Sequence, residues 1–146
     1  MTDTNEPTPA QRDGGGELSG WSEQELDRVG QATELRITSR RADGSLRPFV
    51  TIWVVRAGDN LYVRSAYGTD NPWYRRAKAS GRGRIRAGGI ERDITFEVPG
   101  GDVHGPIDAA YHDQYDQYGP RIVGSVVGEA AAAGTLRLVP DHNEKE

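Results

Sequence analysis

The most constraining feature of the sequence is a run of alternating polar and apolar residues, RGRIRAGGIERDITFEV, which two glycines interrupt. Alternation with a period of two is typical of strands, and Gly88-Gly89 can adopt the positive φ angles that a two-residue hairpin turn needs. Residues 82–87 and 90–98 are therefore predicted to pair as antiparallel strands. The turn also predicts the register: Ala87 opposite Ile90, Arg86 opposite Glu91, Arg84 opposite Asp93 and Arg82 opposite Thr95.

Further strand patterns extend this hairpin into a sheet. Alternation recurs in residues 34–40, 61–65 and 135–139. Residues 48–55 are apolar on both faces, which predicts a central barrel strand covered inside and out. Asp43-Gly44 is predicted to form a type I′ turn, and residues 58–60 to form the next turn. The sequence thus predicts a mainly β fold, a small antiparallel β-barrel of six or so strands with two to four flanking helices.

A capping box predicts the start of the first helix. Ser22 and Glu25 have the spacing at which each side chain accepts a hydrogen bond from the other's backbone amide. Trp21 precedes the box and is placed to pack on Leu26. The helix is predicted to end near Gly30, because few apolar residues follow it.

A second helix follows the strand at 61–65. Asn71 is a good N-cap and Pro72 a good first helical residue, so residues 73–80 are predicted to be helical. Gly81 then provides the C-terminal stop.

A third helix is indicated by apolar residues at helical spacing, Ile107, Ala110, Tyr111, Tyr115 and Tyr118, with Asp108, Asp113 and Asp116 predicted to face outward. The tyrosine stripe is predicted to pack on the barrel. Residues 121–133 are expected to be helical in pieces, because Gly124 and Gly128 weaken the segment.

Composition narrows the functional class. The 146 residues contain no cysteine, which excludes disulfides and thiolate chemistry, and the net charge of −4 argues against bulk nucleic-acid binding. The N-terminus lacks a signal-peptide pattern and no apolar run is long enough to span a membrane, so a cytoplasmic protein is expected. Residues 1–20 and 141–146 are predicted to be tails that flank a single domain at 21–140. The three histidines share no metal-ligand spacing, so no metal site is expected.

The chemistry that remains is anion binding. Arg64, Arg75, Arg76 and Lys78 have no evident acidic partner, whereas Arg84 and Arg86 face acids across the hairpin. Ser65, Gly68 and Thr69 offer hydroxyls and a close backbone approach beside the start of the helix at 72–80, where free amides favour an anion. Alternatively, Asn71-Pro72 is only a helix cap and the basic residues form a solvated face.

These residues also carry a resemblance to a known family. The order of strands followed by YVRSAYGTDNPWYRRAKASGRGRIRAGG resembles the split β-barrel superfamily of flavin-binding proteins, and most closely its deazaflavin-dependent nitroreductase-like branch. The motif residues are Tyr62–Ser65, Gly68, Asn71–Tyr74 and Gly88-Gly89. The resemblance covers residues 35–98. More narrowly, the chain resembles an uncharacterised bacterial family of small domains of unknown function.

The resemblance implies a cofactor and its contacts. It implies that FMN or a deazaflavin coenzyme binds with its phosphate held by Ser65, Gly68 and Thr69 and by Arg75, Arg76 and Lys78. The ring would lie against the strand from Val50 to Trp53. The cofactor would deliver a hydride to an electron-poor substrate, with Tyr67, Trp53, Trp73 or a tyrosine of the tyrosine-rich helix as candidates for the substrate side. Proteins of this kind often pair so that two chains build each pocket, so both a homodimer and a monomer remain open.

Two other functions are compatible with the residues. The first is a noncatalytic binding module for an anionic small molecule, in which the same barrel has no redox role. The second is nucleic-acid contact through the arginine-rich strand at 82–87, which is the least favoured because the acids at 90–98 neutralise it.

Overall fold

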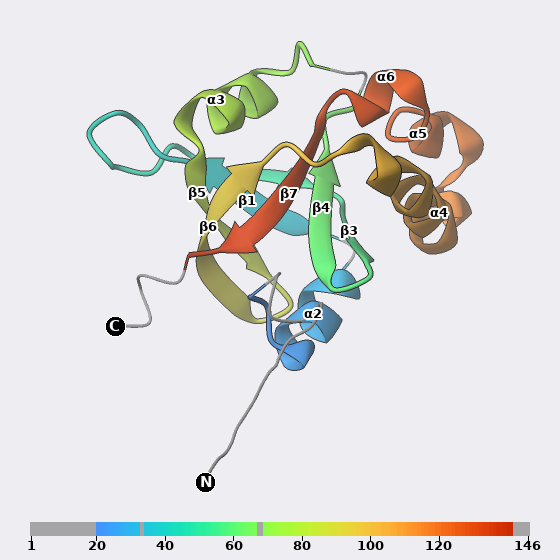
Figure 1. Ribbon diagram of the computed structural model, residues 1–146, viewed down its shortest axis with the longest axis horizontal. Coiled ribbons are helices and arrows are strands. Elements are labelled where there is room, and N and C mark those ends of the chain that lie inside the picture. Colours follow the sequence, from blue (N-terminus) through green and yellow to red (C-terminus); the bar gives the residue numbers. More distant parts are fainter. Residues whose placement is uncertain (1–19, 33, 67–68, 142–146) are drawn as a thin grey trace, which may run out of the picture.

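The computed structural model describes residues 20–32, 34–66 and 69–141, and its centre is one curled antiparallel sheet (Figure 1). Its strands are β1 (Leu35–Ser39), β2 (Val50–Ile52), β3 (Val54–Ala57), β4 (Asn60–Arg64), β5 (Arg82–Ala87), β6 (Ile90–Glu97) and β7 (Thr135–Pro140). Their order in the sheet is β2-β1-β5-β6-β7-β4-β3. Trp53 alone separates the two outermost strands in the chain, so the sheet curls into a nearly closed barrel. The predicted split β-barrel is confirmed.

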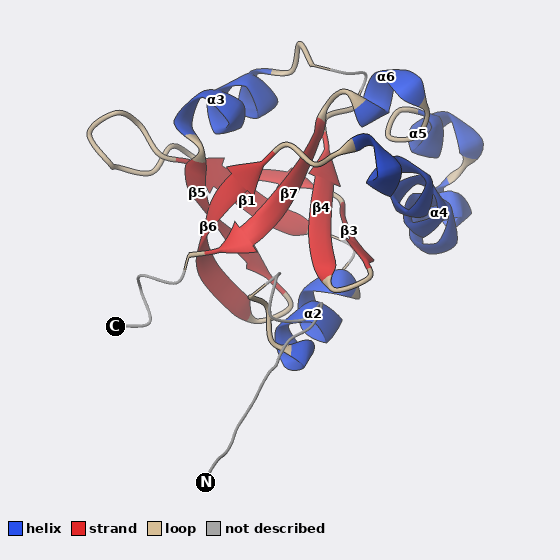
Figure 2. Ribbon diagram, viewed as in Figure 1, coloured by secondary structure: helices blue, strands red, loops and turns tan. Residues whose placement is uncertain are grey.

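Helices cover the ends and one side of this barrel (Figure 2). They are α2 (Glu23–Gly30), α3 (Pro72–Ser80), α4 (His104–Tyr115), α5 (Pro120–Gly124) and α6 (Glu129–Ala132), with 3-10 turns at Gly101–Val103 and Asp116–Tyr118. Figure 1 shows α2 and α3 at opposite ends of the barrel, and α4 to α6 gathered beside β3 and β4. Residues 1–19 and 142–146 of the predicted tails lie outside the described residues.

The hairpin of β5 and β6 has the predicted register. All four predicted pairs, from Ala87 with Ile90 to Arg82 with Thr95, are present. The turn works because Gly88 and Gly89 have φ angles of 58° and 84°, which other residues rarely adopt. The neighbouring strand β1 approaches β5 so closely that a Cβ on Gly83 would lie 2.0 Å from the carbonyl oxygen of Thr38.

The helix boundaries follow the sequence signals. Both hydrogen bonds of the capping box between Ser22 and Glu25 are present, and Trp21 and Leu26 are buried in one cluster. Pro72 begins α3, and Gly81 ends it with a φ of 75°. The segment at 121–133 is helical in two pieces, as predicted.

The predicted central strand at 48–55 is wrong. Its residues form two short strands, β2 and β3, which break at Trp53 and lie at the two ends of the sheet order. Val50 is consequently 37% exposed. The turn before it is also wider than the predicted type I′ turn, because its flanking residues are Arg40 and Leu46, which form a β-bridge, and the amide of Arg41 donates to the carbonyl of Ser45. Within it, the Asp43 carboxylate accepts hydrogen bonds from the amide and the hydroxyl of Ser45.

Two hydrophobic clusters lie on opposite faces of β3 and β4. Val54, Leu61 and Val63 point into the barrel, where α2 and α3 add apolar side chains. Val55 and Tyr62 point outward. They pack against a cluster from α4, α5 and the loop that follows: Ile107, Tyr111, Tyr115, Val123 and Val126. The predicted tyrosine stripe therefore packs on the barrel, except for Tyr118, which is 45% exposed.

Candidate functional site

A furrow runs between α3 and the segment that joins β1 to β2, and it has three sections. The aromatic hollow, of about 410 Å³, is lined by Glu34, Val50, Thr51, Ile52, Trp53, Arg64, Ala66, Asn71, Trp73, Ser125 and Val126. The arginine groove, of about 920 Å³, is lined by Arg40, Arg41, Ala42, Gly44, Arg47, Pro72, Arg75, Arg76, Ala79, Ser80 and Arg82. The neck, of about 30 Å³, lies between them.

Shared side chains place the three sections next to one another. Val50 and Trp73 line both the aromatic hollow and the neck. Arg47 and Arg76 line both the neck and the arginine groove. The furrow therefore changes along its length from apolar and aromatic to strongly cationic.

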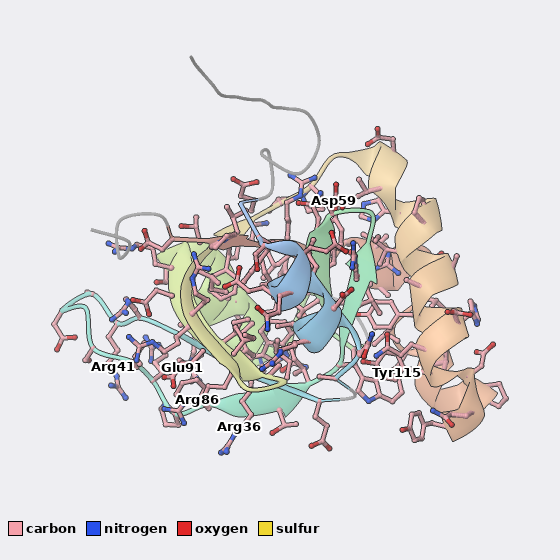
Figure 3. All side chains as sticks on the ribbon, turned by 90° about the horizontal axis from the view of Figure 1, so that it is seen from below. Arg36, Arg41, Asp59, Arg86, Glu91 and Tyr115 are labelled. Carbon is pink, nitrogen blue, oxygen red and sulfur yellow. The ribbon has the colours of Figure 1, made fainter. Side chains whose placement is uncertain are left out.

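Trp53 forms one wall of the aromatic hollow, and Tyr115 holds it there. The two rings are stacked, with centroids 4.1 Å apart and planes 9° apart. The Tyr115 hydroxyl donates to the carbonyl of Val54 at 2.7 Å and accepts from the amide of Val54 at 3.3 Å. Burial raises the pKa of Tyr115 to about 12, so this hydroxyl keeps its proton. Figure 3 shows Tyr115 beside α4, on the side of the barrel away from the loop that carries Arg41.

The backbone of β2 forms another wall. β2 pairs with β1 on one side and is the last strand in the sheet order, so its other side has no strand neighbour. The outward amides and carbonyls of such an edge strand can bind a planar ligand that has its own donors and acceptors.

The start of α3 leaves backbone donors open at the hollow. Asn71 takes the N-cap position with extended φ and ψ angles, but its side chain makes no capping hydrogen bond. The first-turn amides of Trp73 and Tyr74 have no acceptor within the helix. An anion placed here would meet these amides and the positive end of the helix dipole.

The arginine groove is poorly neutralised. Its lining residues include six arginines and no acid. Arg40 binds Asp93 at 3.0 Å, and Arg82 lies 3.7 Å from Asp141. Arg41 donates only to neutral oxygens of Ser45 and Leu46. The guanidiniums of Arg47, Arg75 and Arg76 have no hydrogen bond or ion pair within the described residues, and the Nε of Arg47 is buried. The groove is thus a strongly positive site.

The structure distributes the predicted site residues unevenly. Val50 and Trp53 line the aromatic hollow, and Arg75 and Arg76 line the arginine groove. Lys78 is exposed on α3 but lines none of the three sections. Thr69 is likewise exposed and lines none of them.

Ser65 is buried and lines none of the three sections. Its side chain is fully buried, and its Oγ has no hydrogen-bond partner among the described residues. Its neighbours Arg64 and Ala66 line the aromatic hollow, whereas Ser65 itself does not. Gly68, and with it Tyr67, lies outside the described residues.

Arg64 has an acidic partner, contrary to the expectation from the sequence. Its guanidinium is fully buried and forms an ion pair with Asp108, which was expected to face outward. It also donates to the carbonyl of Val126 at 2.9 Å and the hydroxyl of Thr135 at 2.9 Å, and it lies 3.2 Å from the Nδ1 of His104. Arg64 therefore serves the junction between β4 and α4 and is not available as an anion ligand.

The residues that the sequence analysis missed lie on the side of the groove that faces α3. Arg40, Arg41 and Arg47 flank the turn between β1 and β2, and that turn lies beside α3 in Figure 1. The signal for them was present, because three arginines within eight residues surround a single acid, Asp43. What the sequence could not show is that this turn faces α3.

Two features are absent from the described part of the chain. Within it, no three acidic or histidine side chains gather as metal ligands do. None of its helices has the length and apolar character needed to cross a membrane.

Comparison with solved structures gives the same fold. An F420 reductase matches with a TM-score of 0.52 and 18% identity over 83% of this chain and 96% of that chain. The heme storage protein of Vibrio cholerae matches with a TM-score of 0.53 and 12% identity over 82% and 89%. A conserved hypothetical protein from Mycobacterium tuberculosis matches with a TM-score of 0.56 and 10% identity over 81% and 78%. At these identities the likeness concerns the fold.

Sequence comparison defines the family. No curated protein matches the chain. A family model covers residues 25–138, which include the whole barrel up to β7 and all the helices except the first two residues of α2. The chain therefore belongs to the bacterial family described as "Uncharacterized protein conserved in bacteria (DUF2255)".

Proposed function

We propose that this protein binds a flavin or deazaflavin coenzyme in the furrow and acts as a reductase that passes a hydride to an electron-poor substrate. One observation carries the proposal: an aromatic hollow and an arginine groove adjoin through a narrow neck whose lining residues they share. Such a ligand has the same division, a planar ring at one end and an anionic tail at the other. The shared fold with an F420 reductase supports this reading.

The residues present fit the ring. The aromatic hollow has the size of many small-molecule sites, and Trp53 and Trp73 provide flat apolar surfaces. The edge of β2 offers amides and carbonyls to the heteroatoms of a ring.

The residues also fit a phosphate. The start of α3 leaves amides open at the hollow, and the unpaired guanidiniums of Arg47 and Arg76 line the neck. A buried Nε without a partner is costly, and an anionic oxygen would satisfy it.

In the reaction, the protein would position the coenzyme ring and exclude water from it. The coenzyme, when bound, supplies the hydride. Trp53 and Trp73 would restrict the ring to one orientation and exclude water from it, and the guanidiniums would hold the tail. No side chain of the hollow has to supply a proton for hydride transfer itself.

Titration with riboflavin, FMN and a deazaflavin coenzyme tests the proposal, with absorbance and fluorescence of the ring as the readout. Val50→Arg would fill the hollow, and we expect it to abolish ring binding. Val98→Arg is the matched control, because Val98 is also exposed, at 61%, but lies outside the furrow. If none of the three ligands binds, or if both variants bind equally well, the proposal is overturned.

A second candidate function is a noncatalytic binding module. It rests on the arginine groove, whose lining has six arginines and no acid and could hold an anionic ligand whether or not the ring reacts. A binding module predicts that the protein holds the reduced coenzyme without passing its electrons on. Stopped-flow mixing of the reduced complex with a nitroaromatic acceptor separates the two functions. In a reductase the acceptor oxidises the bound ring faster than it oxidises the free coenzyme, whereas in a binding module it does not.

A further inference from the structure

The arginine groove is larger than a mononucleotide requires. Its volume of about 920 Å³ is more than twice the 410 Å³ of the aromatic hollow, which is to take the whole ring system. A single phosphate attached to a short linker would be met at the neck, by Arg47 and Arg76. Arg40, Arg41, Arg75 and Arg82 lie in the groove beyond that point.

These arginines come from different elements, so no local sequence requirement gathers them. Arg75 belongs to α3, Arg82 begins β5, and Arg40 and Arg41 belong to the turn after β1. A guanidinium stays protonated at any ordinary pH, so the groups repel one another at all times. A cleft lined by charges of one sign attracts ions of the opposite sign, and an anion between the two sides of the groove would relieve the repulsion.

The protein's own acids leave most of this charge uncompensated. Asp93 serves two guanidiniums at once, because it binds Arg84 at 2.6 Å as well as Arg40 at 3.0 Å. The carboxylate nearest to Arg82, that of Asp141, is 3.7 Å away. Arg75 has no bond to any described residue. Arg41 donates hydrogen bonds to neutral oxygens alone, and the acid that its charge acts on, Asp43, is fully exposed.

We infer that the arginine groove selects a coenzyme whose tail carries two or more anionic groups, such as a pyrophosphate or an oligocarboxylate, over a mononucleotide; this inference rests on the proposed function of the furrow. The ring and the first anion would be held at the hollow and the neck. The further anions would lie between Arg75 on α3 and Arg41 on the turn that faces it across the groove. The guanidiniums there would provide the hydrogen-bond donors.

The test is a set of affinities for riboflavin, FMN, FAD and a deazaflavin coenzyme with an oligoglutamate tail. We expect FAD or the oligoglutamate compound to bind at least about tenfold more tightly than FMN in low salt. This advantage should shrink as the salt concentration rises from about 50 mM to about 500 mM, because counterions screen exposed charges. Equal affinities for FMN and both long-tailed compounds would overturn the inference while leaving the proposed function intact.

Variants locate the effect. Arg41→Ala with Arg75→Ala should weaken binding of the preferred long-tailed coenzyme at least about tenfold and change the affinity for riboflavin less than about twofold. Arg75→Ala alone, which breaks no internal bond, should give part of the loss. Arg36→Ala is the matched control, since Arg36 is an exposed arginine of β1 outside the furrow (Figure 3). Equal losses in the control and the double variant would overturn the inference.

A probe without a ring separates the two ideas. Inorganic tripolyphosphate should raise the melting temperature of the native protein more than orthophosphate does, and the double variant should lose this effect. Stabilisation by tripolyphosphate without binding of any ring compound would refute the proposed function and keep the polyanion site. A melting temperature that no polyphosphate changes would refute the groove.

Discussion

The carboxylate of Asp108 on α4 forms an ion pair with the guanidinium of Arg64 on β4, although 44 residues separate them. The Arg64 side chain is fully buried, and its cation lies 5.7 Å from the centre of the Tyr111 ring. A buried charge needs a compensating partner, and Asp108 is the acid that provides it. The pair therefore fastens the helices after residue 103 to the barrel, beside the aromatic hollow.

We expect Asp108→Ala to lower the free energy of unfolding by about 2 kcal/mol, because it strands a buried cation that retains only neutral partners. Urea denaturation followed by circular dichroism measures the loss. Asp113→Ala is the control, since Asp113 is an exposed acid of the same helix with no ion pair to a described residue. A loss no larger than that of the control would show that the ion pair is dispensable.

Tyr115→Phe should cost about 1 to 2 kcal/mol of unfolding free energy. The change removes the hydroxyl that bonds both the carbonyl and the amide of Val54 while keeping the ring that stacks on Trp53. Tyr118→Phe, at an exposed ring of the same aromatic cluster, should cost almost nothing. Equal unfolding midpoints for the two variants in urea would contradict the role of the Tyr115 hydroxyl.

Gly83→Ala should destabilise the barrel by about 3 kcal/mol or prevent folding. An added Cβ would lie 2.0 Å from the Thr38 carbonyl oxygen and 2.9 Å from a ring carbon of Phe96, and the carbonyl belongs to a paired strand that cannot retreat. Gly105→Ala meets no atom within 4 Å and serves as the control. Thermal melts compare the two, and a melting temperature of Gly83→Ala close to that of the control would show that β1 can move away from β5.

Arg76→Ala should weaken binding of FMN about tenfold or more, because a charge-assisted hydrogen bond is worth about 1.5 to 3 kcal/mol. Arg76 lines both the neck and the groove and has no internal bond, so its loss should leave stability unchanged. Lys78→Ala removes a charge from the same helix but outside the furrow. Fluorescence titration of both variants decides whether the position of the charge, and not its number, sets the affinity.

Asp93 predicts how stability depends on pH. A hydrogen bond from Arg84, together with the charges of Arg84 and Arg40, holds the pKa of Asp93 below its usual value of 3.8. A carboxyl whose pKa is lower in the folded state than in the unfolded state stabilises the fold above the unfolded pKa. Its contribution should therefore be complete above about pH 5 and be lost as the pH falls below about 4 towards the lowered folded pKa.

Asp93→Asn tests that dependence. The difference in unfolding free energy between the protein and this variant should be constant from about pH 7 to about pH 5 and narrow below about pH 4. Urea midpoints measured along this range give the difference. A gap that stays constant down to about pH 2.5 would show that the charge of Asp93 contributes nothing to the fold.

The parts of the fold that local sequence could predict are those with local causes. The register of β5 and β6 follows from two glycines that only a tight turn tolerates, and the start of α2 follows from the Ser22 and Glu25 pair. The break at Trp53 has a distant cause. Its ring packs on Tyr115, which comes 62 residues later, so an apolar run looked like one central strand.

The candidate site divides in the same way. Arg75 and Arg76 stood out because basic residues are dense around α3, whereas Arg40, Arg41 and Arg47 became part of the same groove only through the pairing of β1 with β5. Lys78 shows the converse limit. It shares the composition of its neighbours, but helical geometry turns it away from the furrow that they line.

Trp53 links β2 to β3, the two edge strands of the sheet, so the chain itself closes the barrel where these edges meet. We call this junction the seam. Only three residue pairs fasten β2 to β1, so amide hydrogens there should exchange with solvent sooner than those of β5 and β6. A molecule seated in the furrow would lie across this seam and clamp it. Slower deuterium uptake at residues 50–52 would then register occupancy even for a ligand that has neither colour nor fluorescence.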